Sequence, residues 1–179
     1  MKKLSLTLLL AIAVAAPAIA GTEAKTFKDK VVVETVPCRF RDMEFQLDAF
    51  YTGFASSRGA LQTGSGGGVG LNFFFARYFG IGYEGAWYSN DGDGAKLPVG
   101  GNLFFRYPIC SWNLAPYAMV GGGAAWSSAI DGTVGYGNVG GGLEYRFTDH
   151  IGIFGDSRWF YGNQSTSAAN FRAGLRLAF

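Results

Sequence analysis

The sequence has few of the residues from which most active sites are built. Its 179 residues include one histidine, His150, and two cysteines. A catalytic triad or a histidine-rich metal centre needs several such groups together. His150 lies beside Asp149 in a predicted turn, with no serine at a recognisable spacing. No catalytic residue, metal ligand or cofactor is therefore expected, and an enzyme is kept only as a remote alternative.

Two glycine-rich segments resemble ligand-binding loops but lack essential parts of the motifs. Gly64–Gly68 is not followed by the Lys-Ser or Lys-Thr pair of a phosphate-binding loop. Asn90–Gly94 carries two aspartates but lacks the closing glutamate of an EF-hand loop. Both are interpreted as exposed loops, and a bound calcium ion at Asn90–Gly94 is the weaker alternative.

Long apolar runs are absent after the first twenty residues. Lys2 and Lys3 precede an apolar run over residues 4–16, and the sequence Ala-Ile-Ala closes it. This order is typical of a secretory signal peptide, with cleavage expected between Ala20 and Gly21. A membrane anchor is the alternative, but the run is shorter than the roughly 20 residues of a spanning helix. The export translocon is accordingly an expected partner.

The processed chain also lacks an excess of either charge. Removing Lys2 and Lys3 from the 15 basic residues leaves 13, which equals the 13 acidic residues. Nucleic-acid binding would need a clustered basic face. No nucleic-acid partner is expected.

Alternation of side chains dominates what remains. Val69–Tyr88 contains two runs of period two joined at Arg77–Phe79, which is the pattern of a β-hairpin. Val139–Phe160 repeats the unit, and Val99–Tyr107 repeats its first half. We therefore predict a signal peptide over 1–20, an N-terminal arm over 21–43 and one β domain over 44–179.

Eight strands are predicted, each of about the length that a tilted membrane strand requires. They are Glu44–Phe54, Gly68–Arg77, Phe79–Ser89, Val99–Tyr107, Pro116–Trp126, Tyr136–Phe147, Ile151–Tyr161 and Asn170–Phe179. The phase of the fifth strand is unclear because Gly121–Gly123 interrupts it. Tight turns over 77–80, 108–115 and 148–150 alternate with longer loops over 55–67, 90–98, 127–135 and 162–169. Short turns at one end and long loops at the other are typical of outer-membrane barrels.

The two faces of these strands differ in chemistry. One face is oily: Phe45, Leu47, Tyr51, Val69, Leu71, Phe73, Phe75, Ile81, Tyr83, Leu103, Phe105, Leu143, Tyr145, Ile153, Phe171, Leu175 and Leu177. The other carries five acids, Glu44, Asp48, Glu84, Glu144 and Asp156, and five bases, Arg106, Arg146, Arg158, Arg172 and Arg176. An eight-stranded barrel is only wide enough for its interior to be filled by side chains. Large aromatics from every strand would overpack it, whereas opposite charges can pair inside. The prediction is an all-β, eight-stranded, antiparallel, up-and-down transmembrane barrel, with a soluble sandwich as the alternative.

Aromatic residues gather near both ends of the predicted strands, as interfacial girdles would require. Near the turns are Tyr78, Phe79, Tyr107, Trp112, Tyr117 and Phe147, and near the loops are Tyr51, Trp87, Tyr88, Trp126, Trp159 and Tyr161.

The pattern resembles the small outer-membrane β-barrel family of OmpA and OmpX type over nearly all of the processed chain. The final strand ends with Phe171, Leu175, Leu177 and Phe179 in phase. This ending resembles the family's C-terminal signal for the barrel-assembly machinery, although it is also a plain last hydrophobic strand. The resemblance implies an outer-membrane location in a Gram-negative-type envelope, with outer-membrane lipid and lipopolysaccharide as partners. It carries over no active site, and the peptidoglycan-binding domain of larger members is not expected here.

Cys38 in the arm and Cys110 in a turn fall on the periplasmic side of this topology, where oxidation favours disulfides. We hypothesise that they pair and clip the arm across the mouth of the barrel, with two free thiols as the alternative. The expected protein is a monomer that supports the envelope or contacts an extracellular ligand through its loops. Its interior charges are expected to form a plug, and a small-solute channel is the alternative.

Overall fold

The computed structural model describes residues 37–58, 63–90, 93–127, 130–162 and 166–179. The predicted signal peptide, its cleavage site between Ala20 and Gly21, and most of the arm lie outside these residues. Among the described residues, no helix is long and apolar enough to cross a bilayer. The elements are β1 (Glu44–Arg58), β2 (Gly64–Ala76), β3 (Phe79–Asn90), β4 (Asp93–Arg106), the 3-10 helix η1 (Cys110–Trp112), β5 (Leu114–Ser127), β6 (Ile130–Arg146), β7 (Ile151–Gly162) and β8 (Thr166–Ala178).

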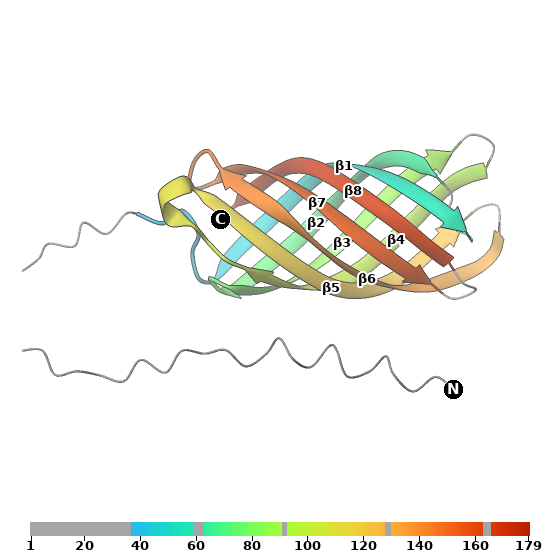
Figure 1. Ribbon diagram of the computed structural model, residues 1–179, viewed down its shortest axis with the longest axis horizontal. Coiled ribbons are helices and arrows are strands. Elements are labelled where there is room, and N and C mark those ends of the chain that lie inside the picture. The colour runs from blue at the N-terminus through green and yellow to red at the C-terminus, as the bar shows by residue number, and fades with distance from the viewer. Residues whose placement is uncertain (1–36, 59–62, 91–92, 128–129, 163–165) are drawn as a thin grey trace, which may run out of the picture. The chain divides into compact units, whose positions relative to one another are not determined.

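The eight strands form a closed barrel in which each strand pairs with its neighbours in sequence and β1 pairs with β8. Every pairing is antiparallel. Figure 1 shows the strands inclined to the long axis of the barrel, as closure of a sheet requires. Closure leaves no unpaired strand edge. The predicted all-β, up-and-down barrel is confirmed.

The barrel has two ends, called the arm end and the cap end. The arm end is where β1 begins and β8 ends, and it carries η1 and the turns at 77–78, 107–113 and 147–150. The cap end is the opposite end, where β1 ends and β8 begins. The strands β3 and β7 begin at the predicted residues, Phe79 and Ile151.

The prediction of long loops at the cap end is wrong, because the strands extend into these segments. The strand β4 begins at Asp93 rather than Val99, and β6 begins at Ile130 rather than Tyr136. The intervals between the strands at this end are only 59–63, 91–92, 128–129 and 163–165. The strands were predicted from the alternation of apolar and polar side chains, whereas strand formation needs only backbone pairing. Segments rich in Gly, Ser and Asp can therefore continue the strand ladder although their sequence is typical of loops.

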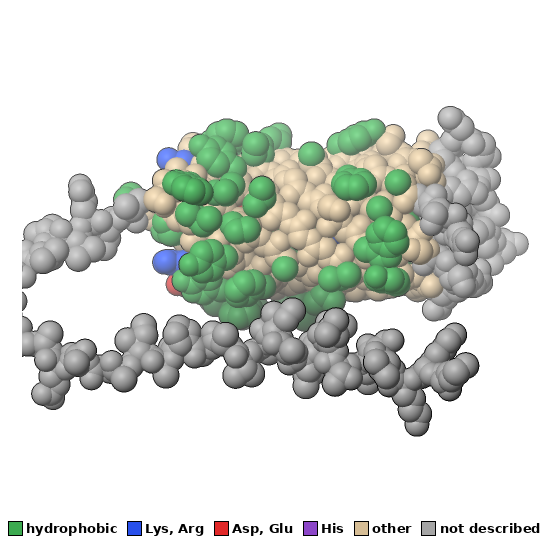
Figure 2. All heavy atoms as spheres, viewed as in Figure 1, with side chains coloured by type: hydrophobic (Ala, Val, Ile, Leu, Met, Phe, Trp, Pro, Cys, Tyr) green, Lys and Arg blue, Asp and Glu red, His purple; other side chains and the backbone are tan. Residues whose placement is uncertain are grey.

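Burial follows the predicted alternation. Along β7, exposed and buried residues alternate without interruption from Ile151 to Phe160. The outward oily residues are exposed, for example Leu103 at 61 % and Tyr83 at 58 %, and only Phe73 among them is half-buried. In Figure 2, hydrophobic side chains gather toward both ends of the visible face of the barrel, with a band of backbone and other side chains between them. An exposed oily exterior is the arrangement of a barrel surrounded by lipid.

The fifth strand has a single phase that its glycines conceal. Tyr117 and Met119 face the interior, while Val120 and Trp126 face outward. Gly121 and Gly123 continue the inward face, where a Cβ atom would lie 2.2 Å from the Gly101 oxygen and 2.0 Å from the Val99 oxygen, respectively. Glycine is therefore required because the backbone of β4 passes too close for any side chain.

Two members of the predicted aromatic girdles are inside the barrel instead. Tyr88 is 1 % exposed and Tyr117 is 6 % exposed. Trp87 points outward, so its neighbour Tyr88 must point inward in a strand. The remaining girdle residues are exposed: Tyr51, Tyr78, Phe79, Trp87, Tyr107, Trp112, Trp126, Phe147, Trp159 and Tyr161.

Candidate functional site

The candidate site is the interior, where the structure places all ten of the charged residues assigned to the inward face. It joins six of them into one network at the arm end: Glu44, Asp48, Glu144, Arg106, Arg146 and Arg176. Glu44 Oε1 lies 2.9 Å from Arg106 Nη1 and 2.7 Å from Arg146 Nη2. Three carboxylates meet three guanidinium groups, so this lower network carries no net charge.

A second network lies nearer the cap end and joins Glu84 and Asp156 to Arg158 and Arg172. Arg172 Nε and Nη2 reach the two oxygens of Asp156 at 2.9 and 2.6 Å, and its Nη1 reaches Glu84 Oε2 at 2.7 Å. The Tyr117 hydroxyl donates to Asp156 Oδ2 at 2.8 Å. Two carboxylates meet two guanidinium groups, so this upper network is neutral as well.

Strand register explains how such distant residues meet. Asp48 lies opposite Arg176 across β1 and β8, and Asp156 lies opposite Arg172 across β7 and β8. Directly opposed residues of one face are within side-chain reach in an antiparallel ladder. The closure of β1 on β8 therefore creates the first pair, and the last hairpin creates the second.

Inward glycines make room for these large side chains. Gly142 lies opposite Asp156, and a Cβ atom at Gly142 would lie 2.5 Å from Asp156 Cβ. A Cβ atom at Gly140 would lie 2.8 Å from Arg158 Cγ in the same way. At these positions a charged side chain of β7 therefore faces a glycine of β6, whose only side chain is a hydrogen atom.

Aromatic rings separate and cover the charges. The Arg106 guanidinium lies 3.8 Å from the centroid of Phe74, and Arg176 lies 4.6 Å from that of Phe154. Arg172 lies 4.5 Å from the centroid of Phe50. Rings at these distances attract guanidinium groups through their quadrupoles.

Sequence reasoning did not identify these interior aromatics, because the overpacking argument directed attention to charges. A signal was present in their phase: Phe50, Phe104, Phe154 and Phe160 each lie two residues from an inward charge.

The arm closes one end of the interior. A disulfide joins Cys38 to Cys110 of η1, with an S–S distance of 2.02 Å, and so forms the predicted clip. Phe40 is completely buried and packs against the guanidinium groups of Arg106 and Arg146, at 5.0 and 5.2 Å. Arg39 Nη1 donates to the carbonyl oxygen of Arg146 at 2.7 Å, which fastens the arm to the end of β6.

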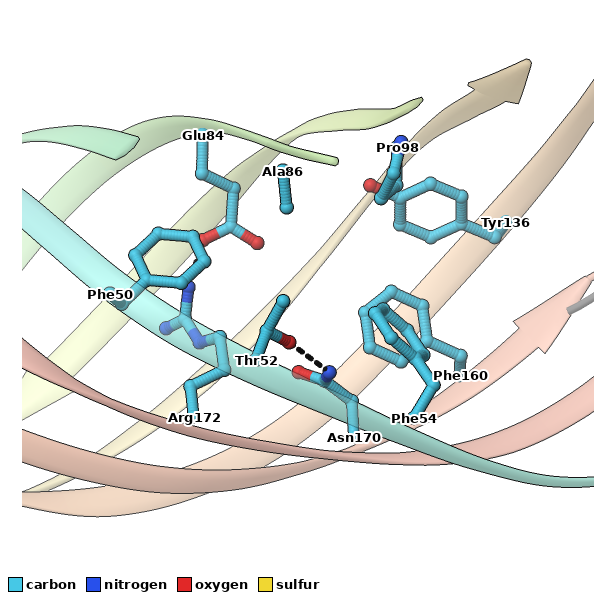
Figure 3. Close-up of a pocket in the computed structure, with 10 residues that line it drawn as sticks. All are labelled: Phe50, Thr52, Phe54, Glu84, Ala86, Pro98, Tyr136, Phe160, Asn170 and Arg172. Atoms are coloured by element: carbon cyan, nitrogen blue, oxygen red, sulfur yellow. Dashed lines mark hydrogen bonds and ion pairs between the residues drawn. The ribbon is translucent and has the colours of Figure 1, made fainter. Parts of the chain in front are cut away.

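An aromatic cap closes the other end. The ring of Phe54 stacks on Tyr88 with centroids 4.5 Å apart and lies 5.5 Å from the Phe160 ring. Tyr136 packs against Phe160 with centroids 5.0 Å apart. These four residues come from β1, β3, β6 and β7, so the aromatic cap spans the bore. Figure 3 shows a small cavity between this cap and the upper network.

The remaining predicted residues lie outside this interior. His150 occupies the turn after β6, where its Nδ1 atom lies 2.8 Å from the Ala178 oxygen. The four terminal residues assigned to the assembly signal, Phe171, Leu175, Leu177 and Phe179, are exposed on the outer face. Among the described residues, no three His, Cys, Asp or Glu side chains are grouped to hold a metal ion. The acidic segment Asn90–Gly94 has side chains that lie outside the described part.

No protein-family model matches this sequence, and no curated protein matches it. Solved structures do match the fold. The N-terminal barrel domain of OprF from Pseudomonas aeruginosa aligns with a TM-score of 0.65 and 14 % identity, over 78 % of this chain and 99 % of that chain. Neisserial surface protein A aligns with a TM-score of 0.58 and 18 % identity, over 76 % and 96 %. Ail, the attachment invasion locus protein of Yersinia pestis, aligns with a TM-score of 0.56 and 15 % identity, over 77 % and 99 %.

The closed barrel, its oily exterior and these structural likenesses define the class of protein. The chain has the fold of the small eight-stranded outer-membrane barrels. Within this fold, the chain has a disulfide-fastened arm and a charged interior.

Proposed function

We propose that this protein is a monomeric, non-catalytic barrel that supports the outer membrane and presents its cap-end hairpins to the outside. The observation that carries this proposal is the closure of the interior at both ends, by Phe40 at the arm end and by the aromatic cap at the other. Between these closures, both ion networks are neutral and packed. A filled bore suits a structural role better than transport.

The energetics of buried ion pairs support a plug rather than a gate. Desolvation of a buried charge costs several kcal/mol and is offset only by well-placed partners. Each of the five interior carboxylates contacts at least one arginine side chain. Opening a path for solutes would break several of these contacts at once, so the closed state is strongly favoured. The same engagement leaves no interior carboxylate free to act as an acid or base.

The surface role rests on the hairpin ends, whose tips at 59–62, 91–92, 128–129 and 163–165 lie outside the described residues. Two proteins of the same fold carry names that refer to the cell surface and to attachment. We extend that surface role to this chain. Outer-membrane lipid, lipopolysaccharide, the export translocon and the barrel-assembly machinery are its proposed partners.

Planar-bilayer recording of the purified, oxidised protein tests the plug. The expected result is no steady conductance beyond that of a protein-free bilayer. Steady, ion-selective conductance would overturn the plug and support the small-solute channel. A separate test replaces residues 59–62 by a Gly-Ser segment of equal length and measures attachment of cells that produce the protein. Loss of attachment with unchanged barrel folding supports the surface role, whereas unchanged attachment for replacements at all four tips would contradict it.

A further inference from the structure

The cavity under the aromatic cap is small and lined on one side by polar groups. Figure 3 shows Glu84 and Arg172 of the upper network facing it, together with Thr52 and Asn170, which are joined by a hydrogen bond. Asn170 Nδ2 donates to Thr52 Oγ1 at 2.6 Å. The Tyr136 ring of the cap also lines the cavity. These residues belong to four different strands, β1, β3, β6 and β8, so the cavity lies across the bore.

Glu84 is less tightly enclosed than its partners. Its side chain is 15 % exposed, whereas that of Arg158 is 0 % exposed and that of Arg172 is 5 % exposed. Glu84 faces inward and lines the cavity, so the exposed part of its side chain lies inside the barrel rather than against the membrane. A carboxylate can accept about four hydrogen bonds. The cavity therefore offers an acceptor to a hydrogen-bond donor.

From these features we infer that the cavity is a binding site for a single water molecule. The space open to the centre of a water-sized sphere is about 10 Å³, which is about what one water needs. The site is too small for a sugar, an amino acid or a detergent head group.

Charge selects water over an ion of similar size. The upper network pairs two carboxylates with two guanidinium groups, so the cavity has no uncompensated charge to attract a cation or an anion. Calcium would need six or more oxygen ligands, many of them charged. Water both donates and accepts, and it can bridge the Glu84 carboxylate to the hydroxyl groups of Thr52 and Tyr136.

The bound water connects the two parts of the interior. Below it lies the ionic upper network, and above it lie the rings of Phe54 and Phe160. A water in this position completes hydrogen bonding where charged and aromatic layers meet. The cap rings of Phe54, Tyr136 and Phe160 line the cavity, so they separate the bound water from the cap end of the barrel. This site goes beyond the proposed plug and does not depend on the surface role.

A crystal structure of the oxidised full chain, at a resolution that shows ordered water, tests the site directly. The expected result is one density peak within about 2.7–3.2 Å of the Glu84 carboxylate and of at least one hydroxyl or amide group of the cavity. An empty cavity, a collapsed cavity, or a larger bound solute would each overturn the proposal.

A variant that fills the cavity gives a second test. Ala86 lines the cavity, and Ala86→Val replaces its methyl side chain by a larger isopropyl group that occupies part of the cavity. We expect the density peak to be lost. Ala173→Val is the matched control, because Ala173 lies on the outer face of β8, and it should leave the peak unchanged. A peak that persists in a folded Ala86→Val protein would contradict the assignment.

Magnetic resonance of the unaltered protein in micelles keeps the test independent of that variant. We expect a cross-relaxation signal between water and the side-chain amide protons of Asn170. Absence of that signal, with the Asn170 amide resonances assigned, would overturn the proposal even if Ala86→Val fails to fold.

Discussion

Asp48 and Arg176 form a bidentate ion pair across the seam where the first and last strands meet. Arg176 Nε and Nη2 lie 2.7 and 2.6 Å from the two carboxylate oxygens of Asp48, and the residues are 128 positions apart in sequence. Arg176 Nη1 also reaches Glu144 Oε2 of β6 at 2.6 Å. One guanidinium group therefore joins the closure of the barrel to the lower network.

Replacement of this arginine should destabilise the barrel strongly. Arg176→Met leaves Asp48 without its ion pair and removes one of the partners of Glu144, so we expect a loss of about 3–5 kcal/mol. Urea unfolding in detergent micelles measures the effect. The control is Arg41→Met, because Arg41 is exposed on the arm. If both variants unfold at the urea concentration of the unaltered protein, the network contributes no stability.

The disulfide should stabilise the barrel as well as fasten the arm. Cys38 and Cys110 are 72 residues apart, and a cross-link of this kind typically contributes about 2–4 kcal/mol. A reducing agent should therefore lower the urea midpoint of the unaltered protein. The Cys38→Ser/Cys110→Ser double variant should match the reduced protein and ignore the reductant. The clip would be excluded if the reducing agent left the urea midpoint of the unaltered protein unchanged and its non-reduced mass lacked the two-hydrogen deficit of a disulfide.

Phe40 is expected to act as the seal of the arm end. Phe40→Ala removes a buried ring from between Arg106 and Arg146, which we expect to cost about 3–5 kcal/mol. Phe147→Ala is the control, since Phe147 lies at the same end but is 50 % exposed. Unfolding measurements on the two variants should differ clearly. Equal, small effects would show that Phe40 does not close the interior.

Two glycines of the β6–β7 hairpin should differ in how an added methyl group affects the yield of folded barrel. A Cβ atom at Gly142 would lie 2.3 Å from the Gly155 oxygen, whereas one at Gly155 would meet nothing closer than the Arg172 oxygen at 3.6 Å. Gly142→Ala should therefore reduce the yield of folded barrel, and Gly155→Ala should not. The heat-dependent gel shift of folded barrels measures both. A normal yield for Gly142→Ala would contradict the close backbone approach.

Much of this architecture was predictable from alternation, because an oily face and a charged face cannot exchange places in lipid. The phase of Asp48, Asp156 and Arg172 was enough to place them inside. Partner choice was not predictable, since it depends on register: Arg176 meets Asp48 only because β8 closes on β1 in one alignment. The cap-end portions of strands such as β4 and β6 were missed because their residues lack the contrast between faces on which the prediction depended.

The interior aromatics were missed for a different reason. The volume argument treated charge and aromatic side chains as competing ways to fill the bore. Inward glycines such as Gly140 and Gly142 provide the space that allows both, with Phe154 packed between Arg172 and Arg176. The side-chain volume that fills the bore must therefore be summed over all the strands, not judged from each strand alone.

Tryptophan fluorescence in bilayers of brominated lipid tests the central claim, that the oily face meets lipid and the charges lie inside. Trp87, Trp126 and Trp159 are exposed on the outer faces of β3, β5 and β7, and the fourth tryptophan, Trp112, is exposed on η1 at the arm end. The account predicts strong quenching by bromine on the acyl chains, compared with the same protein in unbrominated lipid. Unquenched fluorescence from a folded protein that stays dissolved without lipid or detergent would contradict it.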